Sequence, residues 1–221
     1  MSTHGTSDSP GRTIAAIRKA VSKFAPPSVG QVAGESHDPF QVLVSTVISL
    51  RTRDEVTIEA SRRLFSRADS PWAVAALSTE EIERLIYPAG FYRTKAANIR
   101  RIAGIIAAAG GEVPRERERL LDLPGVGVKT ANLTLSLGYG LPFICVDIHV
   151  HRISNRLGWV RTKTPEETEM SLMDLLPKRY WIEINGLLVG FGQRICTPQS
   201  PRCSVCPVGQ RCPRIGVHRS R

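Results

Sequence analysis

The spacing of apolar residues along this chain restricts its fold more than any other feature of the sequence. Ile14, Ile17, Val21 and Phe24 fall three or four residues apart with Arg and Lys between them, which is typical of an amphipathic helix over residues 12–24. The alternation of period two that marks a strand never persists for more than a few residues. The sequence therefore predicts an all-α fold.

Helix start signals support this prediction farther along the chain. Thr52, Ser78 and Thr164 are each followed three residues later by Glu, as in a capping box. Ser70 directly before Pro71 is a fourth start signal. Each of these positions is expected to open a helix.

Two apolar segments predict further helices. Residues 40–50 are apolar enough for a buried core helix, although composition alone also permits a strand. A stripe of isoleucines between residues 99 and 106 predicts another helix, which Gly110 and Gly111 end.

A glycine-rich turn, LPGVGVKTA at residues 123–131, lies between two helical patterns. Without large side chains, the backbone N–H groups of Gly125, Val126 and Gly127 can approach a ligand closely. The helix that follows from Val128 presents its positive end there, which suits a DNA phosphate. A plain turn between two helices is the simpler alternative.

Lys129 falls in the first turn of that helix, where the helix dipole disfavours a cation. A residue that violates a local rule is a candidate for function. The same field, together with burial, favours the neutral amine, which is the nucleophilic form of lysine. The alternative is an exposed lysine that contacts phosphate.

Asp147 stands in the segment VDIHV, where a new helical pattern begins. One interpretation is a helix N-cap, a common role of aspartate. The other is a carboxylate that stabilises positive charge developing on a sugar. Both can hold, because capping fixes the position of the carboxylate. His149 is interpreted as structural.

The segments LPGVGVKTA and VDIHV, with Lys129 and Asp147 eighteen positions apart, resemble the endonuclease III family of helix-hairpin-helix DNA glycosylases. The resemblance runs from about Pro39 to Cys212. It implies that the lysine attacks the sugar C1′ and that the aspartate assists loss of the base. The expected activity is excision of oxidised pyrimidines from double-stranded DNA, followed by β-elimination through a lysine Schiff base, which cuts the strand 3′ to the abasic site.

Two further segments resemble loops that handle DNA in that family. SLRTRD at residues 49–54 stands where a residue fills the gap left by the extruded base, a role that would fall to Arg51, although many members carry Gln there. GFYRTKA at residues 90–96 matches the loop that wedges an apolar side chain into the base stack, which makes Phe91 the wedge. Without the resemblance, Phe91 would be interpreted as a core residue.

Four cysteines near the C-terminus are separated by six, two and five residues, a spacing that predicts a metal site. Zinc and iron–sulfur clusters both accept four cysteines, so the residues alone do not choose between them. The resemblance implies a [4Fe–4S] cluster and a basic, DNA-contacting loop that carries Arg202. Cys145 remains as a buried free thiol. The expected ligands are Cys196, Cys203, Cys206 and Cys212.

The charge balance favours a polyanionic partner. Lys and Arg number 30 against 20 Asp and Glu, and no acidic residue follows Glu183. Double-stranded DNA with damaged bases or abasic sites is the expected partner. No apolar run reaches the roughly 18–20 residues of a membrane span, and the opening residues lack the apolar core of an export signal. A cytoplasmic monomer is expected, associated with the nucleoid if the source is prokaryotic.

The resemblance also implies two domains. A six-helix barrel with the helix-hairpin-helix motif is expected over residues 36–142, and an iron–sulfur cluster domain over residues 12–35 plus 143–221. Residues 1–11 are expected to be a disordered leader. The active site would lie in a cleft between the domains.

Two other functions compete with this interpretation. Adenine-mismatch glycosylases of the same superfamily carry a catalytic Glu at the position of Thr46, and thymine-mismatch members carry Tyr at that of Lys129, so both residues argue against a monofunctional enzyme. A non-catalytic DNA-binding or electron-carrying iron–sulfur protein would not need the pair of Lys129 and Asp147.

Overall fold

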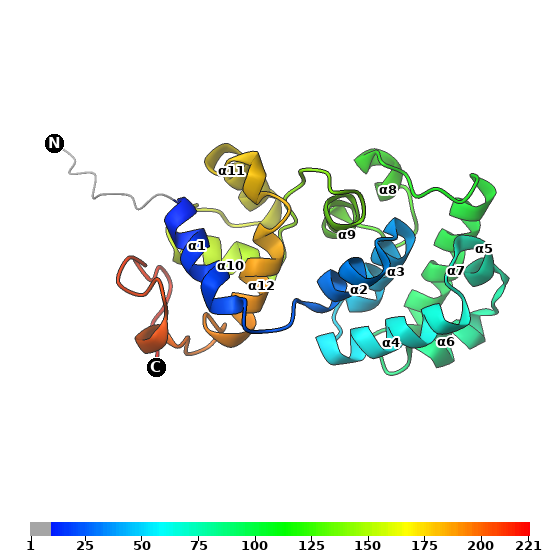
Figure 1. The fold of residues 1–221 in the computed structure, drawn as a ribbon, viewed down its shortest axis with the longest axis horizontal. Helices are drawn as coiled ribbons and strands as arrows, with labels where there is room; N and C mark the ends of the chain where they lie inside the picture. The colour runs from blue at the N-terminus through cyan, green and yellow to red at the C-terminus, as the bar shows by residue number, and fades with distance from the viewer. Residues whose placement is uncertain (1–9) are drawn as a thin grey trace. The chain divides into compact units, whose positions relative to one another are not determined.

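The computed structural model describes residues 10–221, and within that part of the chain every regular element is helical. The all-α prediction is confirmed. The chain divides into two compact units, a central unit of residues 26–143 and a terminal unit in which residues up to 25 join residues 144–221 (Figure 1). No helix among the described residues is both long and apolar enough to cross a membrane.

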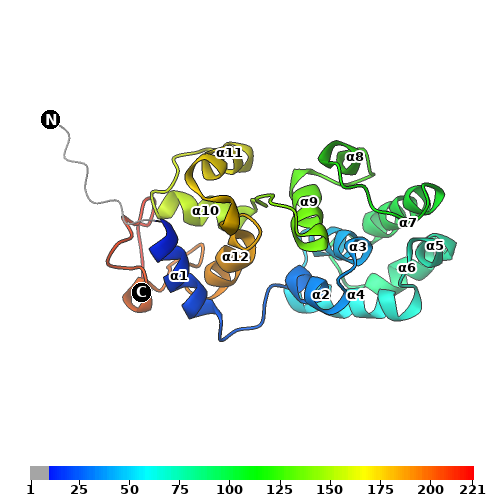
Figure 2. The ribbon, with the colours of Figure 1, turned by 45° about the horizontal axis from the view of Figure 1, so that its top comes forward.

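The central unit is built around α3 and α7. In Figures 1 and 2, α5 and α6 lie beside α7, whereas α2, α4 and α9 lie beside α3, in agreement with their contacts. A π-helical turn, Thr134–Gly138, continues α9. The helices of this unit are α2 (Ser28–Ser36), α3 (Pro39–Ser49), α4 (Asp54–Arg67), α5 (Pro71–Ala76), α6 (Thr79–Ile86), α7 (Tyr92–Ala108), α8 (Arg117–Leu121) and α9 (Val128–Leu133).

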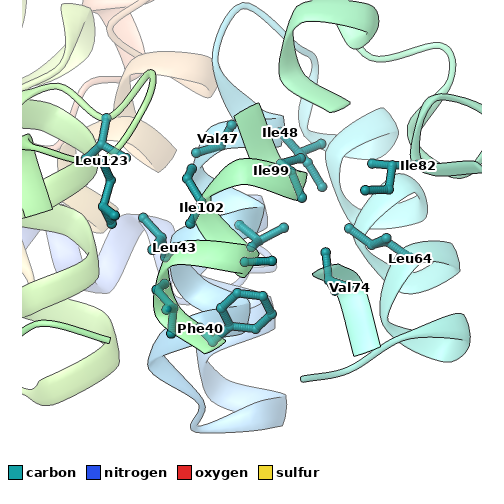
Figure 3. Close-up of a cluster of buried hydrophobic side chains, with 14 of the residues drawn as sticks. Phe40, Leu43, Val47, Ile48, Leu64, Val74, Ile82, Ile99, Ile102 and Leu123 are labelled. Carbon is teal, nitrogen blue, oxygen red and sulfur yellow. The ribbon is translucent and has the colours of Figure 1, made fainter. Parts of the chain in front are cut away.

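The core of the central unit explains why residues 39–49 form a helix. Phe40, Leu43 and Ile48 of α3 are at most 2% exposed, and they meet Ile99 and Ile102 of α7 in one apolar cluster (Figure 3). Burial of each such side chain stabilises the fold by about 1.5–3 kcal/mol. A helix surrounded by other helices buries side chains on all sides, so its sequence lacks a polar face.

The terminal unit is smaller and combines both ends of the described chain. Helix α1 packs against α12, which in turn packs against α10. Ile14 and Ile17 of α1 are fully buried there beside Phe191, so the predicted amphipathic helix is confirmed, although it ends at Val21 and does not include Phe24. Its elements are α1 (Pro10–Val21), α10 (Ile148–Arg156), α11 (Pro165–Leu175), a 3-10 turn (Lys178–Tyr180), α12 (Ile184–Arg194) and a second 3-10 turn (Cys203–Val205).

The boundaries of the units differ from the expected ones. Helix α2 packs against α3 and α4, so the chain enters the central unit at Pro26 and not at residue 36. The chain leaves that unit after Phe143, one residue later than expected. Residues 1–9 of the expected leader lie outside the described part, whereas residues 10 and 11 already belong to α1.

The predicted helix starts are mostly confirmed. Ser78 forms a complete capping box with Glu81, and the Ser70 hydroxyl accepts from the Ala73 amide. Thr164 caps α11, but the Glu167 carboxylate accepts from the amide of Lys163 and so completes no box with Thr164.

The capping box at Thr52 is wrong. Arg53 is the N-cap of α4 and makes no side-chain cap bond. The Thr52 hydroxyl instead accepts from the amide of Gly90 and from the ammonium of Lys95, because these donors approach it from the start of α7.

Candidate functional site

The turn between α8 and α9 presents its backbone outward. Leu123 and Val126 are 5% and 7% exposed, and the Val126 amide donates to the Leu123 carbonyl at 3.1 Å. These two side chains anchor the turn in the apolar core of the central unit. Gly125 and Gly127 are exposed between and beyond them.

The two glycines serve different purposes. Gly125 has φ +75°, and a Cβ there would lie 2.4 Å from Nδ2 of Asn98, so both backbone conformation and space favour glycine. A Cβ on Gly127 would meet nothing within 4 Å. Gly127 is the N-cap of α9 and makes no side-chain cap bond, and a helix N-terminus of this kind is suited to an anion.

Lys129 is the second residue of α9 and is half-buried. Its neighbours Thr130 and Ala131 are buried in the core of the unit, which fixes the helix that carries it. The predicted place in the first helical turn is confirmed, whereas its role as a nucleophile stays a prediction.

Asp147 is the N-cap of α10, as one of the two interpretations expected. Its Oδ1 accepts from the amides of His149 and Val150, both at 2.9 Å. These two bonds fix the position of the carboxylate. Asp147 belongs to the terminal unit and Lys129 to the central unit.

Two arginines on α10, which sequence reasoning did not identify, connect this helix with the cysteine segment. Arg152 donates to the carbonyl of Cys196 at 3.0 Å and lies 3.1 Å from Nδ1 of His149. Arg156, which is 8% exposed, donates to the carbonyls of Thr197 and Pro198. Their spacing of four residues on one helix face was the available signal.

The four predicted cysteine ligands line one pocket of about 390 Å³, open solvent included. Apolar side chains form much of the rest of its lining, among them Phe191, Ile195 and Val208. The guanidinium of Arg156 lies 3.5 Å from Sγ of Cys196. Within residues 10–221, no three His, Cys, Asp or Glu side chains are arranged to hold a single metal ion.

The chemistry of these thiols suits a cationic group. Burial, with a further contribution from neighbouring cysteines, raises the pKa of the Cys206 and Cys212 thiols. A positively charged metal centre would reverse this by stabilising the thiolates, as metal coordination generally does.

The loops that carry Arg51 and Phe91 lie side by side in the central unit. The guanidinium carbon of Arg51 is 5.4 Å from the centre of the Phe91 ring, and the ring is 63% exposed. Both residues adopt the left-handed conformation, with φ 52° and 56°. Gly90 is required between the loops, because a Cβ there would lie 2.4 Å from the carbonyl oxygen of Arg51.

Lys95 is a further residue of these loops to which sequence reasoning assigned no role. It is 6% exposed and its ammonium donates to the carbonyls of Ile48 and Leu50 and to the Thr52 hydroxyl. The signal was present in the sequence, since Lys95 falls on the buried stripe of α7 that continues with Ile99.

The basic C-terminal segment is exposed, as expected for a phosphate-contacting surface. Arg202 lies between two cysteines of the pocket, and its amide donates to the carbonyl of Ile195 at 2.9 Å. Every arginine after Glu183 is exposed, namely Arg194, Arg202, Arg211, Arg214, Arg219 and Arg221.

Comparison with known proteins identifies close relatives. The family described as HhH-GPD superfamily base excision DNA repair protein matches residues 44–178. Endonuclease III of Thermotoga maritima is 52% identical over 176 residues, which cover 79% of this chain and 83% of the relative. Endonuclease III of Bacillus subtilis is 41% identical, with 83% and 84% covered. Against the chloroplastic endonuclease III homolog 2 of Arabidopsis thaliana, the chain matches 48% of the relative's length.

Solved structures of endonuclease III and of a related glycosylase are similar to this chain. A trapped endonuclease III–DNA covalent intermediate is 34% identical with a TM-score of 0.75, and the match covers 91% of this chain and 96% of the other. A thermostable thymine-DNA glycosylase, 23% identical with a TM-score of 0.71, shares the fold.

Proposed function

Because the chain belongs to the endonuclease III family, the bifunctional glycosylases and lyases of base excision repair, we propose that Lys129 is its nucleophile. The observation that carries this proposal is the place of Lys129 in the first turn of α9, directly after the exposed hairpin. The neutral amine attacks C1′ of the damaged nucleotide, and the bond from C1′ to the base breaks. The sugar ring opens to give an imine between C1′ and the lysine nitrogen.

Strand cleavage follows from this imine. Loss of a proton from C2′ and departure of the phosphate oxygen from C3′ cut the strand 3′ to the lesion. Hydrolysis of the imine then returns the free lysine. The proposed substrates are oxidised pyrimidines and abasic sites in double-stranded DNA. The enzyme is proposed to act as a monomer in the cytoplasm, associated with the nucleoid if the source is prokaryotic.

Asp147 is proposed to assist departure of the base. Because two amides hold its Oδ1, the carboxylate keeps one orientation next to the positive charge that develops on the sugar. The cap therefore supports the catalytic role, since it removes the need to order the side chain during the reaction.

Two backbone positions and two side chains are proposed to hold the DNA. Gly125 and Gly127 offer amides to a phosphate near the lesion, whereas the amide of Val126 already donates to the carbonyl of Leu123 and the buried Val126 side chain anchors the turn. Chemistry at C1′ requires the damaged nucleotide outside the base stack. Phe91 wedges the stack and Arg51 fills the vacated space, which agrees with the exposure of both side chains.

The four cysteines are proposed to hold a [4Fe–4S] cluster. They line one pocket together with apolar side chains, and four cysteine thiolates are the ligand set that such a cluster would take. When bound, the cluster cross-links a segment too short for a core of its own. That cross-link would position Arg202 for contact with phosphate.

Borohydride trapping tests the proposed nucleophile. Wild-type protein should form a covalent adduct with abasic duplex DNA when borohydride reduces the imine. Lys129→Gln should lose trapping and strand cleavage while it retains most DNA binding. Lys129→Arg is the matched control, because it keeps a cation for phosphate but supplies no amine that can form the imine.

The outcomes separate the competing functions. Trapping that persists in Lys129→Gln would assign the nucleophile to another amine. Wild-type protein that releases bases but never traps would be a monofunctional glycosylase. Protein that binds DNA without releasing bases or cutting abasic sites would be a binding module.

A further inference from the structure

Lys95 is a charged residue on the buried face of α7. It precedes Ile99 and Ile102 on the same stripe, and its exposed fraction is only 6%. Burial of a lysine lowers the stability of the fold unless its ammonium is hydrogen-bonded or paired with a charge. The hydrogen-bond acceptors of Lys95 therefore indicate its role.

Three acceptors surround the Lys95 ammonium. The distances are 2.7 Å to the carbonyl of Ile48, 2.5 Å to that of Leu50 and 2.9 Å to the hydroxyl of Thr52. An ammonium has three N–H donors, so each donor has one acceptor. The carbonyls belong to the C-terminal end of α3, where a helix lacks internal donors and carries partial negative charge.

These contacts reach both DNA-handling loops. Leu50 and Thr52 flank Arg51, and the backbone amide of Lys95 donates to the carbonyl of Phe91 at 3.0 Å. One residue thus holds the neighbours of Arg51 through its side chain and Phe91 through its backbone. The Thr52 hydroxyl adds a second connection, since it also accepts from the amide of Gly90 at 3.1 Å.

The backbone at both loop tips needs such support. Arg51 and Phe91 have φ 52° and 56°, a conformation that costs a non-glycine residue about 1–2 kcal/mol. Strained residues of this kind persist only where surrounding contacts over-determine them. The bonds of Lys95 and Thr52 provide those contacts.

Two other roles fit Lys95 less well. Burial lowers its pKa to about 8, which would suit a nucleophile. However, its nitrogen is enclosed by three acceptors and is not free to approach a sugar. A purely apolar core position would be filled more favourably by Met or Leu, which carry no charge to bury.

We propose that Lys95 is a positioning residue that locks the loops of residues 49–54 and 90–96 together, so that Arg51 and Phe91 enter the base stack as one element. This inference rests on the proposed function, in which those two side chains extrude the damaged nucleotide. Lys95 itself does not touch the DNA.

Two variants and a matched control test the proposal. Lys95→Met removes the ammonium at similar volume, and Thr52→Val removes the hydroxyl that joins the loops. Thr57→Val is the control, because Thr57 is also buried and its hydroxyl donates only to the carbonyl of Arg53 within the first turn of α4. Thermal unfolding and circular dichroism establish which variants fold.

The decisive measurement is single-turnover excision of an oxidised pyrimidine in a fully paired duplex, compared with trapping on a preformed abasic site in single-stranded DNA. Only the paired substrate requires extrusion. Lys95→Met and Thr52→Val should lose about tenfold or more on the paired lesion, and less than about threefold on the abasic strand. The losses should not add in the double variant, because both changes break one network. The control should retain both activities.

Each result bears on the proposal. Equal losses on both substrates, or no loss on the paired lesion in folded Thr52→Val, would overturn the positioning role. If Lys95→Met does not fold, the comparison of Thr52→Val with Thr57→Val on the two substrates still tests the positioning role. Failure of the wild-type protein to trap on abasic duplex DNA would instead refute the proposed function.

Discussion

The guanidinium of Arg51 lies over the ring of Phe91, with 5.4 Å between the guanidinium carbon and the ring centre. Both side chains are exposed, and their contact with each other covers part of each of them. Such a cation–π contact at an exposed site is worth about 0.5–1 kcal/mol. The contact would break when the two side chains separate within a base stack.

Removal of either loop-tip side chain should slow extrusion. Phe91→Ala and Arg51→Ala are expected to reduce excision from paired duplexes, and to reduce cleavage of an abasic site in flexible single-stranded DNA much less, because unstacking costs little there. Single-turnover rates on both substrates check this. Equal losses on the two substrates would indicate lost phosphate contacts or misfolding.

Gly90→Ala should separate the two loops without removing any existing side chain. The added Cβ would lie 2.4 Å from the carbonyl oxygen of Arg51, so the backbone must move. Excision from paired DNA should fall and the melting temperature should decrease. Gly104→Ala is the matched control within α7, where a Cβ meets nothing within 4 Å, and it should stabilise the protein by roughly 0.5–1 kcal/mol. A silent Gly90→Ala would contradict the close approach.

The two roles of Asp147 can be separated by two substitutions. Asp147→Asn should slow base removal, leave a preformed abasic site partly cleavable and keep stability, because Asn is a good N-cap. Asp147→Ala should lose the same activity and also about 1 kcal/mol of stability. Excision rates and denaturant unfolding provide the comparison. Unchanged base removal in Asp147→Asn would exclude the proposed charge stabilisation.

The cysteine pocket predicts the metal content. Anaerobically purified protein should be brown, with about four irons and acid-labile sulfide per chain. Cys203→Ala should lose the cluster and weaken DNA binding, because the loop with Arg202 would lose its anchor. Cys145→Ala is the control, since Cys145 is buried outside the pocket. Stoichiometric zinc without iron would contradict the cluster.

Lys95 should make stability depend on pH in the alkaline range. Burial lowers its pKa from 10.5 to about 8, so between these values the unfolded chain binds more protons than the folded one. Stability from this residue therefore rises as the pH increases from 8 to 10.5 and is constant below 8. Over that pH range the unfolding free energy of the wild type should rise relative to that of Lys95→Met. A difference that is constant with pH would contradict the burial of a titrating amine.

The sequence allowed the helices and most of their starts to be predicted, because caps such as Ser78 and apolar stripes such as that of α7 are local signals. The hairpin and the four cysteines were recognisable for the same reason. The place of Asp147 at a helix N-terminus also followed from local pattern, and two backbone hydrogen bonds to its carboxylate confirm it.

Contacts between distant segments were not predictable in this way. Thr52 has the spacing of a cap, yet its hydroxyl accepts from donors 38 and 43 residues farther along the chain, the amide of Gly90 and the ammonium of Lys95. Helix α2 shows a related limit, since only packing decides to which unit a short helix belongs. The spacing of Arg152 and Arg156 places them on one helix face, but it could not indicate their partners, because these are backbone carbonyls, which carry no sequence signature.

The pairing of α1 with α12 has a consequence for synthesis of the protein. On the ribosome α1 emerges early, but its packing partner, Ile184–Arg194, emerges only after the whole central unit. Domains generally fold as units during translation, so residues 26–143 can fold before α12 has been synthesised. Until then, the apolar stripe of α1 has no helix to pack against. We therefore expect the terminal unit to fold last, and a nascent chain stalled before residue 184 to bind chaperones through α1.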